Sequence, residues 1–566
     1  MKSLSSLFLT AAFALAACGS PSTVATIAPS PVTASPSSSA TGQPSERGAA
    51  ASTTAFPRSP VSEAPRNWQL LDEAADHVPG ISSERAMREL LAGKPRRSVL
   101  VAIIDNGIDT AHADLRENLW VNPKEIGGNG KDDDGNGFID DVHGWNFIGG
   151  RDGQDVHFDT FEVTREYARC HHEAAASGLP AITDAARCKV IDGDYEKQKQ
   201  TIERSAKNYR EIHTLMTQIL PVLKRAAGTD SLTVEKVRAV SMTTPQVTQA
   251  RQVYLELASQ GATPTVIEDG LKSLEGQVKY ALNTSYNPRT IVGDNYADAS
   301  EHHYGNADVM GQDAKHGTHV AGIIGAVRGH GLGVEGIAPA VKLMMLRVVP
   351  DGDERDKDVA NAIRYAVDNG AQVISMSFGK AYSPLKAAVD EAVQYADSHG
   401  VLMVHAAGND GADLGKGKNF PTPVYLSGGR PTNWIEVGAS SWKGGDSLAA
   451  PFSNYGQPQV DVFAPGVDIL STIPGNQYER DSGTSMAAPV VTGLAALLLD
   501  YYPNLTASDI KSIILSSVTK TDQMVVRPGD GGERVPFASL SATGGIVNAY
   551  NAVKMAEQVS GAKARP

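Results

Sequence analysis

Gly483-Thr484-Ser485-Met486-Ala487-Ala488-Pro489 is a stretch of small residues that leads directly into the apolar run Val490–Leu499. The pattern predicts a turn followed by a buried helix, with Ser485 where the helix begins. At that place a hydroxyl is exposed, and the free N–H groups and positive dipole end of the helix favour an anion beside it. Ser485 is therefore a candidate nucleophile. The alternative is that it only caps a buried helix, because serine is a common N-cap residue.

A nucleophilic serine needs a base, and the chain offers a histidine and a carboxylate. Serine attacks a carbonyl at neutral pH only when a general base takes its proton and a third group orients that base. His316 opens the segment His316-Gly317-Thr318-His319-Val320-Ala321-Gly322, and Asp105 ends the apolar run Val99–Ile104. Together with Ser485, these residues could form a Ser-His-Asp triad.

These three segments, in the order Asp, His, Ser, resemble those of the subtilisin-like serine proteases, or subtilases. A fourth segment, Ala406-Ala407-Gly408-Asn409-Asp410, resembles the oxyanion-hole stretch of that family. The resemblance implies that Asp105, His316 and Ser485 are the catalytic triad. It also implies that the Asn409 side chain and the Ser485 backbone N–H hold the oxyanion while a peptide bond is cleaved through an acyl-enzyme.

Ser377-Phe378-Gly379 resembles the strand on which subtilases bind an extended substrate, backbone to backbone. Ala407 and Gly408 are then expected to line the pocket for the residue before the scissile bond. Because backbone pairing tolerates many side chains, the resemblance implies a serine endopeptidase of broad specificity that acts on proteins or peptides. Asn106 stands where the family commonly has Thr or Ser, but this difference removes no triad group.

Two other classes of protein fit the sequence less well. A catalytically silent subtilase scaffold, acting as a surface binding or docking protein, is expected to lack a triad residue or Asn409, and all four are present. A lipase-type hydrolase needs Gly-x-Ser-x-Gly and the order Ser, Asp, His. His316 and His319 could also form an H-x-x-H metal site, but metalloprotease spacing differs, so His319 is expected to be a buried, hydrogen-bonded histidine.

From Val99 onward, apolar runs alternate with amphipathic segments, which is typical of an α/β protein. Helices are expected from about Asp358 to Asn369 and from Ser383-Pro384 to Gly400. Parallel strands buried on both faces are expected at four apolar runs: Val99–Ile104, Leu343–Val349, Val373–Met376 and Val401–Val404. With the resemblance, this pattern predicts a subtilisin-like three-layer fold with a mostly parallel sheet.

The composition limits the possible partners. At 566 residues with 41% hydrophobic side chains, the chain can form a sizeable core and more than one domain. Its net charge of −13 and isoelectric point near 5.6 argue against a nucleic-acid partner. The sequence gives no indication of the oligomeric state.

The first 18 residues predict a secretory signal that ends in a lipid-bearing cysteine. Met1-Lys2 precedes the apolar segment Leu4–Ala17, which is too short to span a bilayer. Leu15-Ala16-Ala17-Cys18 resembles the lipobox of bacterial lipoproteins, which implies acylation of Cys18 and attachment to a membrane. Gly19 after the cysteine favours the outer membrane or the cell surface. The alternative is a signal peptide with an incidental cysteine.

Two segments separate the signal from the expected catalytic domain. Residues 19–65 are rich in Pro, Ser, Thr and Ala, which predicts a disordered tether. Residues 66–98 carry a short helical pattern and are shorter than the inhibitory propeptide that subtilases usually have. The catalytic domain is expected over residues 99–157 and 286–566, with no further domain after it.

Residues 158–285 lie between the two catalytic parts and predict an inserted helical subdomain. Apolar side chains recur there at helical spacing, from Ile202 through Ala206 to either Leu215 or Met216 and on to Ile219. The sequence does not indicate the role of this subdomain.

Two cysteines, Cys170 and Cys188, lie 18 positions apart in this insertion. In an exported protein such a pair suggests a disulfide. Closing that loop could stabilise the fold by about 3 kcal/mol. The weaker alternative is a metal site that uses His171 or His172, since no second ligand pair has the required spacing.

Oxygen-bearing side chains recur at alternate positions between Asn129 and Asp141. Counted from Asp132, a glycine is sixth, which matches the first two-thirds of an EF-hand loop. The pattern predicts a calcium site with Asp132, Asp134, Asn136, Phe138 and Asp140 as ligands, and a buried Ile139. His143 occupies the twelfth position, where an EF-hand has Glu. Some extended subtilases resemble this stretch and bind calcium there, whereas the alternative is a plain acidic surface loop.

Overall fold

The computed structural model describes residues 54–563, apart from 173–176, 332, 418 and 530. The predicted signal peptide, Cys18 and residues 19–53 of the predicted tether lie outside the described residues. The chain divides into a helical unit, Phe158–Asn287, and a larger unit formed by the parts before and after it. The helical unit covers nearly the same residues as the predicted insertion.

A nine-stranded sheet forms the centre of the larger unit, in the order β10-β13-β7-β6-β5-β4-β1-β3-β2. Neighbouring strands are parallel except for β10 and β13. The strands are β1 (Val99–Asp105), β2 (Gly144–Asn146), β3 (Val341–Arg347), β4 (Val373–Met376), β5 (Leu402–Ala406), β6 (Trp434–Ser440), β7 (Val462–Pro465), β10 (Thr519–Lys520) and β13 (Gly545–Ile546). The four predicted strands are among them, which confirms the α/β fold with a mostly parallel sheet.

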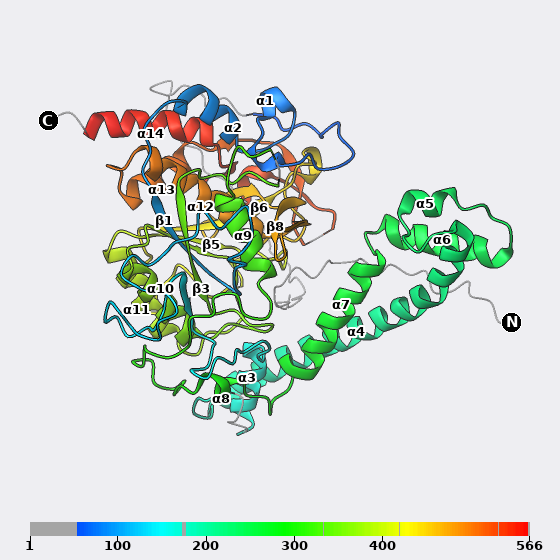
Figure 1. Cartoon of the computed structure of the whole chain (residues 1–566), viewed down its shortest axis with the longest axis horizontal. Helices are drawn as coiled ribbons and strands as arrows, with labels where there is room; N and C mark the ends of the chain where they lie inside the picture. The colour runs from blue at the N-terminus through cyan, green and yellow to red at the C-terminus, as the bar shows by residue number, and fades with distance from the viewer. Residues whose placement is uncertain (1–53, 173–176, 332, 418, 530, 564–566) are drawn as a thin grey trace, which may run out of the picture. The chain divides into compact units, whose positions relative to one another are not determined.

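Each face of the sheet packs on its own layer of helices (Figure 1). In β1, Val101 and Ile103 belong to one apolar core, and Ala102 and Ile104 belong to the other. The first core includes helices α9 (Lys315–Gly325), α12 (Thr484–Tyr501), α13 (Ala507–Ser516) and α14 (Ala549–Lys563). The second includes α10 (Asp356–Asp368) and α11 (Lys386–Ser398). Burial on both faces explains why the strands read as continuous apolar runs.

Helix α12, which follows the small-residue stretch, lies inside the first core. It is long and apolar enough to cross a membrane, but 94% of its apolar window is buried within the protein. Its apolar side chains therefore stabilise the core of a folded unit, as in the central helix of a water-soluble protein.

Two helix boundaries differ from the prediction. Helix α10 begins at Asp356, and α11 begins at Lys386 rather than at Ser383-Pro384. The Leu385 N–H donates to Asp356 Oδ2 at 2.7 Å. Because α10 holds this amide, the residues after Pro384 form a turn before the helix starts.

Residues 54–98 pack against the larger unit. They include the short helices α1 (Glu73–Asp76) and α2 (Ser83–Ala86), blue in Figure 1, and α2 lies beside the red helix α14. Trp68 and Ile81 are fully buried in the first core. Residues 54–65, which the sequence assigns to the tether, include Phe56, whose side chain is also buried. The ordered segment therefore begins earlier than composition indicates, because one aromatic anchor outweighs the polar residues around it.

Smaller elements complete the larger unit. Two antiparallel hairpins pair β8 with β9 and β11 with β12. The elements are η1 (Trp68–Leu70), η2 (Met87–Leu91), α8 (Arg289–Val292), η4 (Gly445–Ser447), β8 (Ile469–Ile473), β9 (Gln477–Asp481), β11 (Met524–Val526), β12 (Arg534–Pro536) and η5 (Phe537–Ser539). The β8–β9 hairpin immediately precedes the stretch that contains Ser485.

The helical unit is built on one long helix. It comprises α3 (Glu162–Cys170), α4 (Ala185–Ala227), α5 (Val234–Ala239), α6 (Pro245–Ser259), α7 (Pro264–Gly276) and η3 (Gln277–Ala281). Helix α4 has 43 residues and ends at Gly228, whose φ of 65° suits glycine. Along the predicted apolar stripe, Ile202, Ala206 and Met216 are buried, whereas Leu215 is 39% exposed.

A disulfide joins Cys170 to Cys188 within the helical unit. It connects the last residue of α3 to the first turn of α4. With both sulfurs in this bond, neither cysteine is available as a metal ligand. His171 instead pairs with Asp192, its Nε2 lying 2.9 Å from Oδ1.

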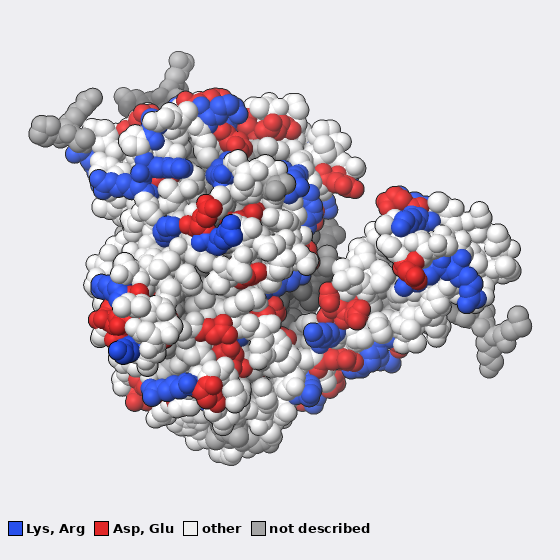
Figure 2. Space-filling view, in the orientation of Figure 1, with Lys and Arg blue, Asp and Glu red and all other residues white. Residues whose placement is uncertain are grey.

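On the face shown in Figure 2, Lys and Arg side chains are interspersed with Asp and Glu rather than gathered in one patch. This mixed distribution does not produce a large field of one sign on that face.

Candidate active site

Asp105 and His316 meet at the carboxyl edge of the sheet. Asp105 is the last residue of β1, and His316 lies in the first turn of α9. His316 Nδ1 donates to Asp105 Oδ1 at 2.7 Å. The Asp105 side chain is 1% exposed and that of His316 is 20% exposed. The buried carboxylate can therefore orient a ring that still reaches solvent.

Asn106 and Gly317 fix the distance between these two elements. The Asn106 side chain accepts a hydrogen bond from the Gly317 N–H at 2.9 Å, and its own N–H donates to Asp105 Oδ1 at 2.7 Å. A Cβ on Gly317 would lie 2.1 Å from the Gly107 carbonyl oxygen. Only glycine allows α9 to approach the end of β1 so closely. Asn106 thus bonds to the Asp105 carboxylate, next to which the sequence placed it, and also holds the Gly317 N–H of α9.

The surroundings of His316 favour its charged form. Burial lowers its pKa, but the charge and hydrogen bond of Asp105 outweigh this effect. With smaller contributions from Asp481 and Asp313, the pKa of His316 is raised from 6.5 to about 8. At a pH near 8, the His316 ring is therefore neutral in half of the molecules.

Ser485 lies in the first turn of α12 and is 6% exposed. Its hydroxyl donates to the Ser377 carbonyl oxygen at 3.1 Å, while the Ser377 hydroxyl donates to the Ser485 carbonyl oxygen at 3.0 Å. Ser485 and His316 are both described, and no hydrogen bond joins them in this structure. The serine is thus held by the segment just after β4, Ser377–Gly379, that the sequence assigns to substrate binding.

Asn409 follows β5 and is held by its amide oxygen. Asn409 Oδ1 accepts from the Thr484 N–H at 2.8 Å and from the Thr484 hydroxyl at 3.0 Å. A Cβ on Gly483 would lie 3.5 Å from Asn409 Nδ2 and equally far from the Ser485 nitrogen. The two predicted oxyanion donors therefore lie near the same point. Thr484, which positions the amide, was not found from the sequence.

The predicted substrate strand is supported by a buried pair of side chains. His405 Nε2 lies 2.9 Å from the Phe378 carbonyl oxygen, and His405 Nδ1 lies 2.9 Å from Glu436 Oε1. Lys380 pairs with Phe420 in both directions, its N–H donating at 3.1 Å and its carbonyl accepting at 2.9 Å. The His405–Glu436 pair could not be predicted from the sequence, because the two residues are far apart in the chain and lie on separate strands.

Gly408 and Ala407, which were expected to line the pocket, have different surroundings in the structure. Gly408 has a φ of 100°, and a Cβ there would lie 2.4 Å from Asn454 Nδ2. Only glycine suits this position. Ala407 is fully buried in a third apolar cluster with Phe463 and Leu448, so its side chain does not reach solvent in this structure.

Comparison with known proteins shows to which family the chain belongs. A model of the subtilase family, peptidase S8, matches residues 96–531. The chain belongs to the subtilase family. Thermitase from Thermoactinomyces vulgaris is 33% identical over 322 residues, which are 55% of this subtilase and 95% of thermitase. Subtilisin DY from Bacillus licheniformis is 38% identical over 257 residues, which are 45% and 82% of the two chains.

Two further matches are weaker, one in the share of the relative that is covered and the other in structural similarity. A thermophilic serine proteinase from Bacillus sp. strain AK1 is 45% identical over 184 residues, which are 32% of this subtilase and 42% of that protein. This subtilase thus spans less than half the length of that relative. A solved structure of a mutant of the protease domain of PatA covers 44% of this chain and 82% of its own, with 28% identity and a TM-score of 0.35.

His319 of this subtilase is a buried structural histidine, as expected. It is 1% exposed, and its Nε2 lies 3.1 Å from the carbonyl oxygens of both Ile469 and Glu479. Burial lowers the pKa of His319, although Asp481 opposes this effect. The neutral ring joins α9 to the β8–β9 hairpin.

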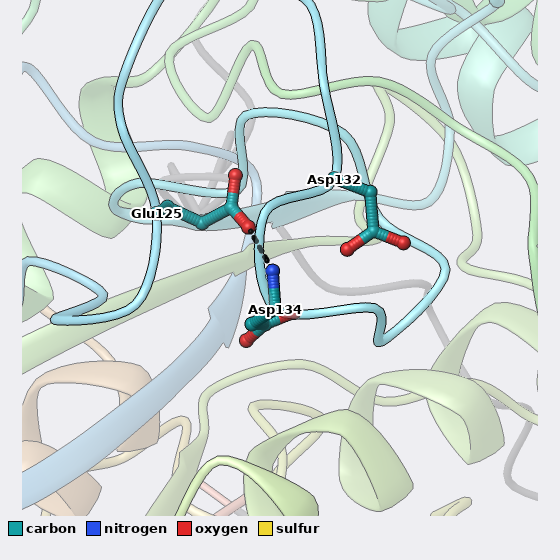
Figure 3. Close-up of side chains that lie close together, drawn as sticks. All are labelled: Glu125, Asp132 and Asp134. Atoms are coloured by element: carbon teal, nitrogen blue, oxygen red, sulfur yellow. Dashed lines mark hydrogen bonds between the residues drawn. The ribbon is translucent and has the colours of Figure 1, made fainter.

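The predicted calcium loop brings three carboxylates together. Glu125, Asp132 and Asp134 each place one oxygen within 4.8 Å of the others. The three side chains are drawn in Figure 3. Asp132 accepts hydrogen bonds from the backbone N–H groups of Gly135, Asn136 and Gly137. Although partial burial opposes ionisation, these amides hold the pKa of Asp132 below its usual value. Glu125, which lies before the motif, was not among the predicted ligands.

The later positions of the loop depart from the EF-hand pattern. The expected burial of Ile139 is wrong, because this side chain is 52% exposed and Phe138 is buried in its place. Phe138 packs against Trp145 and Tyr365 in the second core, which turns the next side chain outward. Asp140 accepts from the N–H groups of Asn129 and Gly130, and Asn136 Nδ2 donates to Asp141.

Proposed function

We propose that this subtilase is a serine endopeptidase that cleaves peptide bonds by means of Ser485, His316 and Asp105. The observation that carries the proposal is the 2.7 Å hydrogen bond between Asp105 Oδ1 and His316 Nδ1. A histidine held through Nδ1 by a carboxylate keeps Nε2 free to accept a proton. The first turn of α12 contains Ser485, whose hydroxyl bonds to the Ser377 carbonyl just beyond the carboxyl end of β4.

In the proposed reaction, His316 Nε2 takes the Ser485 proton as Oγ attacks the peptide carbonyl. Ser485 would first exchange its hydrogen bond to Ser377 O for one to His316. Asp105 holds the tautomer of the ring and stabilises the imidazolium. His316 then gives the proton to the leaving amine, and water hydrolyses the acyl-enzyme by the reverse sequence.

The oxyanion of the tetrahedral intermediate would accept hydrogen bonds from Asn409 Nδ2 and the Ser485 N–H. Since Thr484 occupies Asn409 Oδ1 with two hydrogen bonds, the amide presents its nitrogen to the substrate. A donor fixed before the reaction costs no reorganisation when the charge develops. The substrate would lie extended along Ser377–Gly379 and pair with the backbone, which favours broad specificity toward proteins and peptides.

The proposal is tested by digesting casein in the presence of class-specific inhibitors. A fluorophosphonate should stop digestion, and 1,10-phenanthroline, which removes zinc, should not. The opposite result would favour a metalloprotease that uses His316 and His319. A folded protein that neither digests casein nor reacts with the fluorophosphonate would favour the silent-scaffold alternative.

The activity should depend on pH through His316. Only the neutral ring can take the serine proton, so kcat/KM should rise with pH, pass its midpoint near 8 and reach a plateau above it. At pH 7 about one-tenth of the enzyme would be active. Asp481→Asn removes a charge that raises this pKa, so its midpoint should lie at lower pH. A midpoint at or below 6.5, or one unmoved in Asp481→Asn, would contradict this account.

We also propose that the loop of Asp132, Asp134, Asn136, Phe138 and Asp140 binds calcium with Glu125. Hard oxygen donors of this kind suit Ca²⁺, and Glu125 Oε2 is buried without a hydrogen bond among the described residues. The ion would hold the loop between β1 and β2.

EDTA should therefore lower the melting temperature. At calcium one hundred times above Kd the ion would stabilise the fold by about 2.7 kcal/mol, which corresponds to about 3–4 °C for a unit of this size. Asp134→Asn should melt at the lower temperature and no longer respond to EDTA. Asp298→Asn, which changes an exposed loop carboxylate, is the matched control and should keep the response. Identical melting curves with and without EDTA would contradict a calcium site here.

The lipobox at Cys18 supports a further proposal, that the enzyme is exported and anchored to a membrane by a lipid on this cysteine. The chain should then incorporate radiolabelled palmitate in a bacterial host and fractionate with the membranes. Cys18→Ala should lose both properties while it keeps casein digestion. A wild-type protein that is exported without label would favour the alternative of an ordinary signal peptide.

A further inference from the structure

The segment of residues 54–98 makes contacts along much of the larger unit. The Thr54 N–H donates to Lys520 O at 2.9 Å, and the Phe56 carbonyl accepts from Gly445 N–H at the same distance. Further along, the guanidinium of Arg85 lies 4.1 Å from the centre of the Tyr550 ring, on α14. These contacts come from the start of the segment and from its second half, so it is bound at more than one place along its length.

Trp68 is the largest fully buried side chain of this segment. Its ring is fully buried, and its Nε1–H donates to Val467 O at 2.9 Å. Val467 belongs to the loop Gly466–Asp468, which joins β7 to β8. Asp468 in this loop has a φ of 54°, a region that few non-glycine residues adopt without support. A buried hydrogen-bond donor directed at this loop can supply that support.

The same loop holds the turn before Ser485. Gly466 O accepts from the Gly483 N–H at 2.8 Å, and the Asp468 N–H donates to the Ser482 hydroxyl at 2.8 Å. A Cβ on Gly466 would lie 2.7 Å from Gly483 O, so the two stretches are in close contact. A shift of the loop would therefore move the first turn of α12.

Two more contacts connect the segment to the same region. Arg480, one residue before the end of β9, donates to Ala64 O and to Asp468 O, each at 2.8 Å. At the other end of α12, the Arg97 N–H donates to Asp500 O at 2.9 Å. The segment thus holds the helix that contains Ser485 at both of its ends.

The position of the segment differs from that of an inhibitor. Within residues 54–98, all of them described, no hydrogen bond or ion pair reaches His316, Ser377–Gly379, Asn409 or Ser485. The segment also continues directly into β1, the strand that ends in Asp105. The segment therefore contacts elements that carry the site residues. It makes no polar contact with the residues expected to bind the substrate.

We propose that residues 54–98 remain on the active enzyme, and that Trp68 is a positioning residue that acts on Ser485 through Val467. This inference rests on the proposed peptidase function. It means that removal of the segment inactivates the enzyme, whereas removal of an inhibitory propeptide would activate it.

The role of Trp68 is tested with Trp68→Phe in the full chain, using fluorophosphonate titration to count active sites. Phenylalanine keeps an aromatic ring and loses the donor to Val467. We expect kcat per titrated site to fall about tenfold, with KM nearly unchanged, because small displacements of a nucleophile are costly. The matched control is Trp145→Phe, which also loses a buried bond from Nε1, to Tyr304 O at 2.7 Å, but lies far from this loop in the sequence. Equal kcat values for the two folded variants would overturn the assignment.

Retention of the segment is tested independently by measuring the N-terminus of the wild-type chain that fluorophosphonate has labelled. Mass spectrometry should find a labelled form that begins at or before Thr54. A labelled form that begins after Trp68 would overturn the inference and leave the peptidase function intact. Absence of any labelled form, with the chain folded, would instead contradict the proposed function itself.

Discussion

Ser485→Ala is expected to abolish peptide hydrolysis, with kcat lowered about 10⁶-fold. The substitution removes the only atom of this side chain that can form the acyl-enzyme. It also removes the hydrogen bond to Ser377 O, but the bond from the Ser377 hydroxyl to the backbone of residue 485 is kept. The loss of one such bond costs about 1 kcal/mol, so the variant should remain folded.

The matched control for this prediction is Ser517→Ala. Ser517 is also buried and donates its hydroxyl to a backbone carbonyl, that of Ile514. Both variants and the wild type should show similar melting curves, measured by circular dichroism. Casein digestion that persists in Ser485→Ala at more than about one-hundredth of the wild-type rate would contradict the assignment of the nucleophile.

Asp105→Asn is expected to lower kcat about 10⁴-fold. The Asp105 carboxylate accepts the Nδ1 proton of His316, which leaves Nε2 able to accept the serine proton. An asparagine amide could donate to Nδ1 instead, which would put the proton on Nε2 and block the transfer. The variant would also lose the largest contribution that raises the pKa of His316, so the midpoint of its residual activity should move to lower pH.

Asp461→Asn is the control for the loss of a buried carboxylate. Asp461 Oδ2 accepts from the Glu436 N–H at 2.8 Å, and an asparagine oxygen can take its place. Its kcat should stay within a few-fold of the wild type. If Asp105→Asn behaved like Asp461→Asn, Asp105 would not orient the base.

Local signals in the sequence predicted the centre of the fold and the candidate triad. β1 is a run of apolar residues ending in one acid, and α12 follows a small-residue turn, so strand, helix and reactive groups were all recognisable. The Asp105–His316 contact could be expected because both residues lie where their elements meet the carboxyl edge of the sheet. For β1 and α12, the sequence pattern and the packing in the structure agree.

Features that depend on contacts across the chain were not predictable in this way. His405 and Glu436 read as polar residues within apolar strands, and only the pairing of β5 with β6 puts them side by side. Similarly, composition assigned residues 54–65 to a tether, because a buried Phe56 cannot be told from an exposed one without its neighbours. Thr484 looked like a turn residue, and its hydrogen bonds to Asn409 became apparent only in three dimensions.

The predicted calcium loop matches the EF-hand pattern only in its first half. The glycine and aspartates of its first half form the expected turn around Asp132. The second half has Phe138 where the core needs an aromatic ring, and the next side chain, Ile139, therefore points to solvent. Packing in the second core determines which of the two side chains, Phe138 or Ile139, points inward. A pattern based on ligand spacing contains no information about this packing.

The most direct test of the account is to label the purified protein with a fluorophosphonate probe and locate the adduct by tandem mass spectrometry. The account predicts one probe per chain, bound to Ser485 within the peptide that contains Gly483–Pro489. Labelling should disappear in Ser485→Ala and persist in Ser517→Ala. An adduct on any other residue, or a folded chain that digests casein without reacting with the probe, would contradict it.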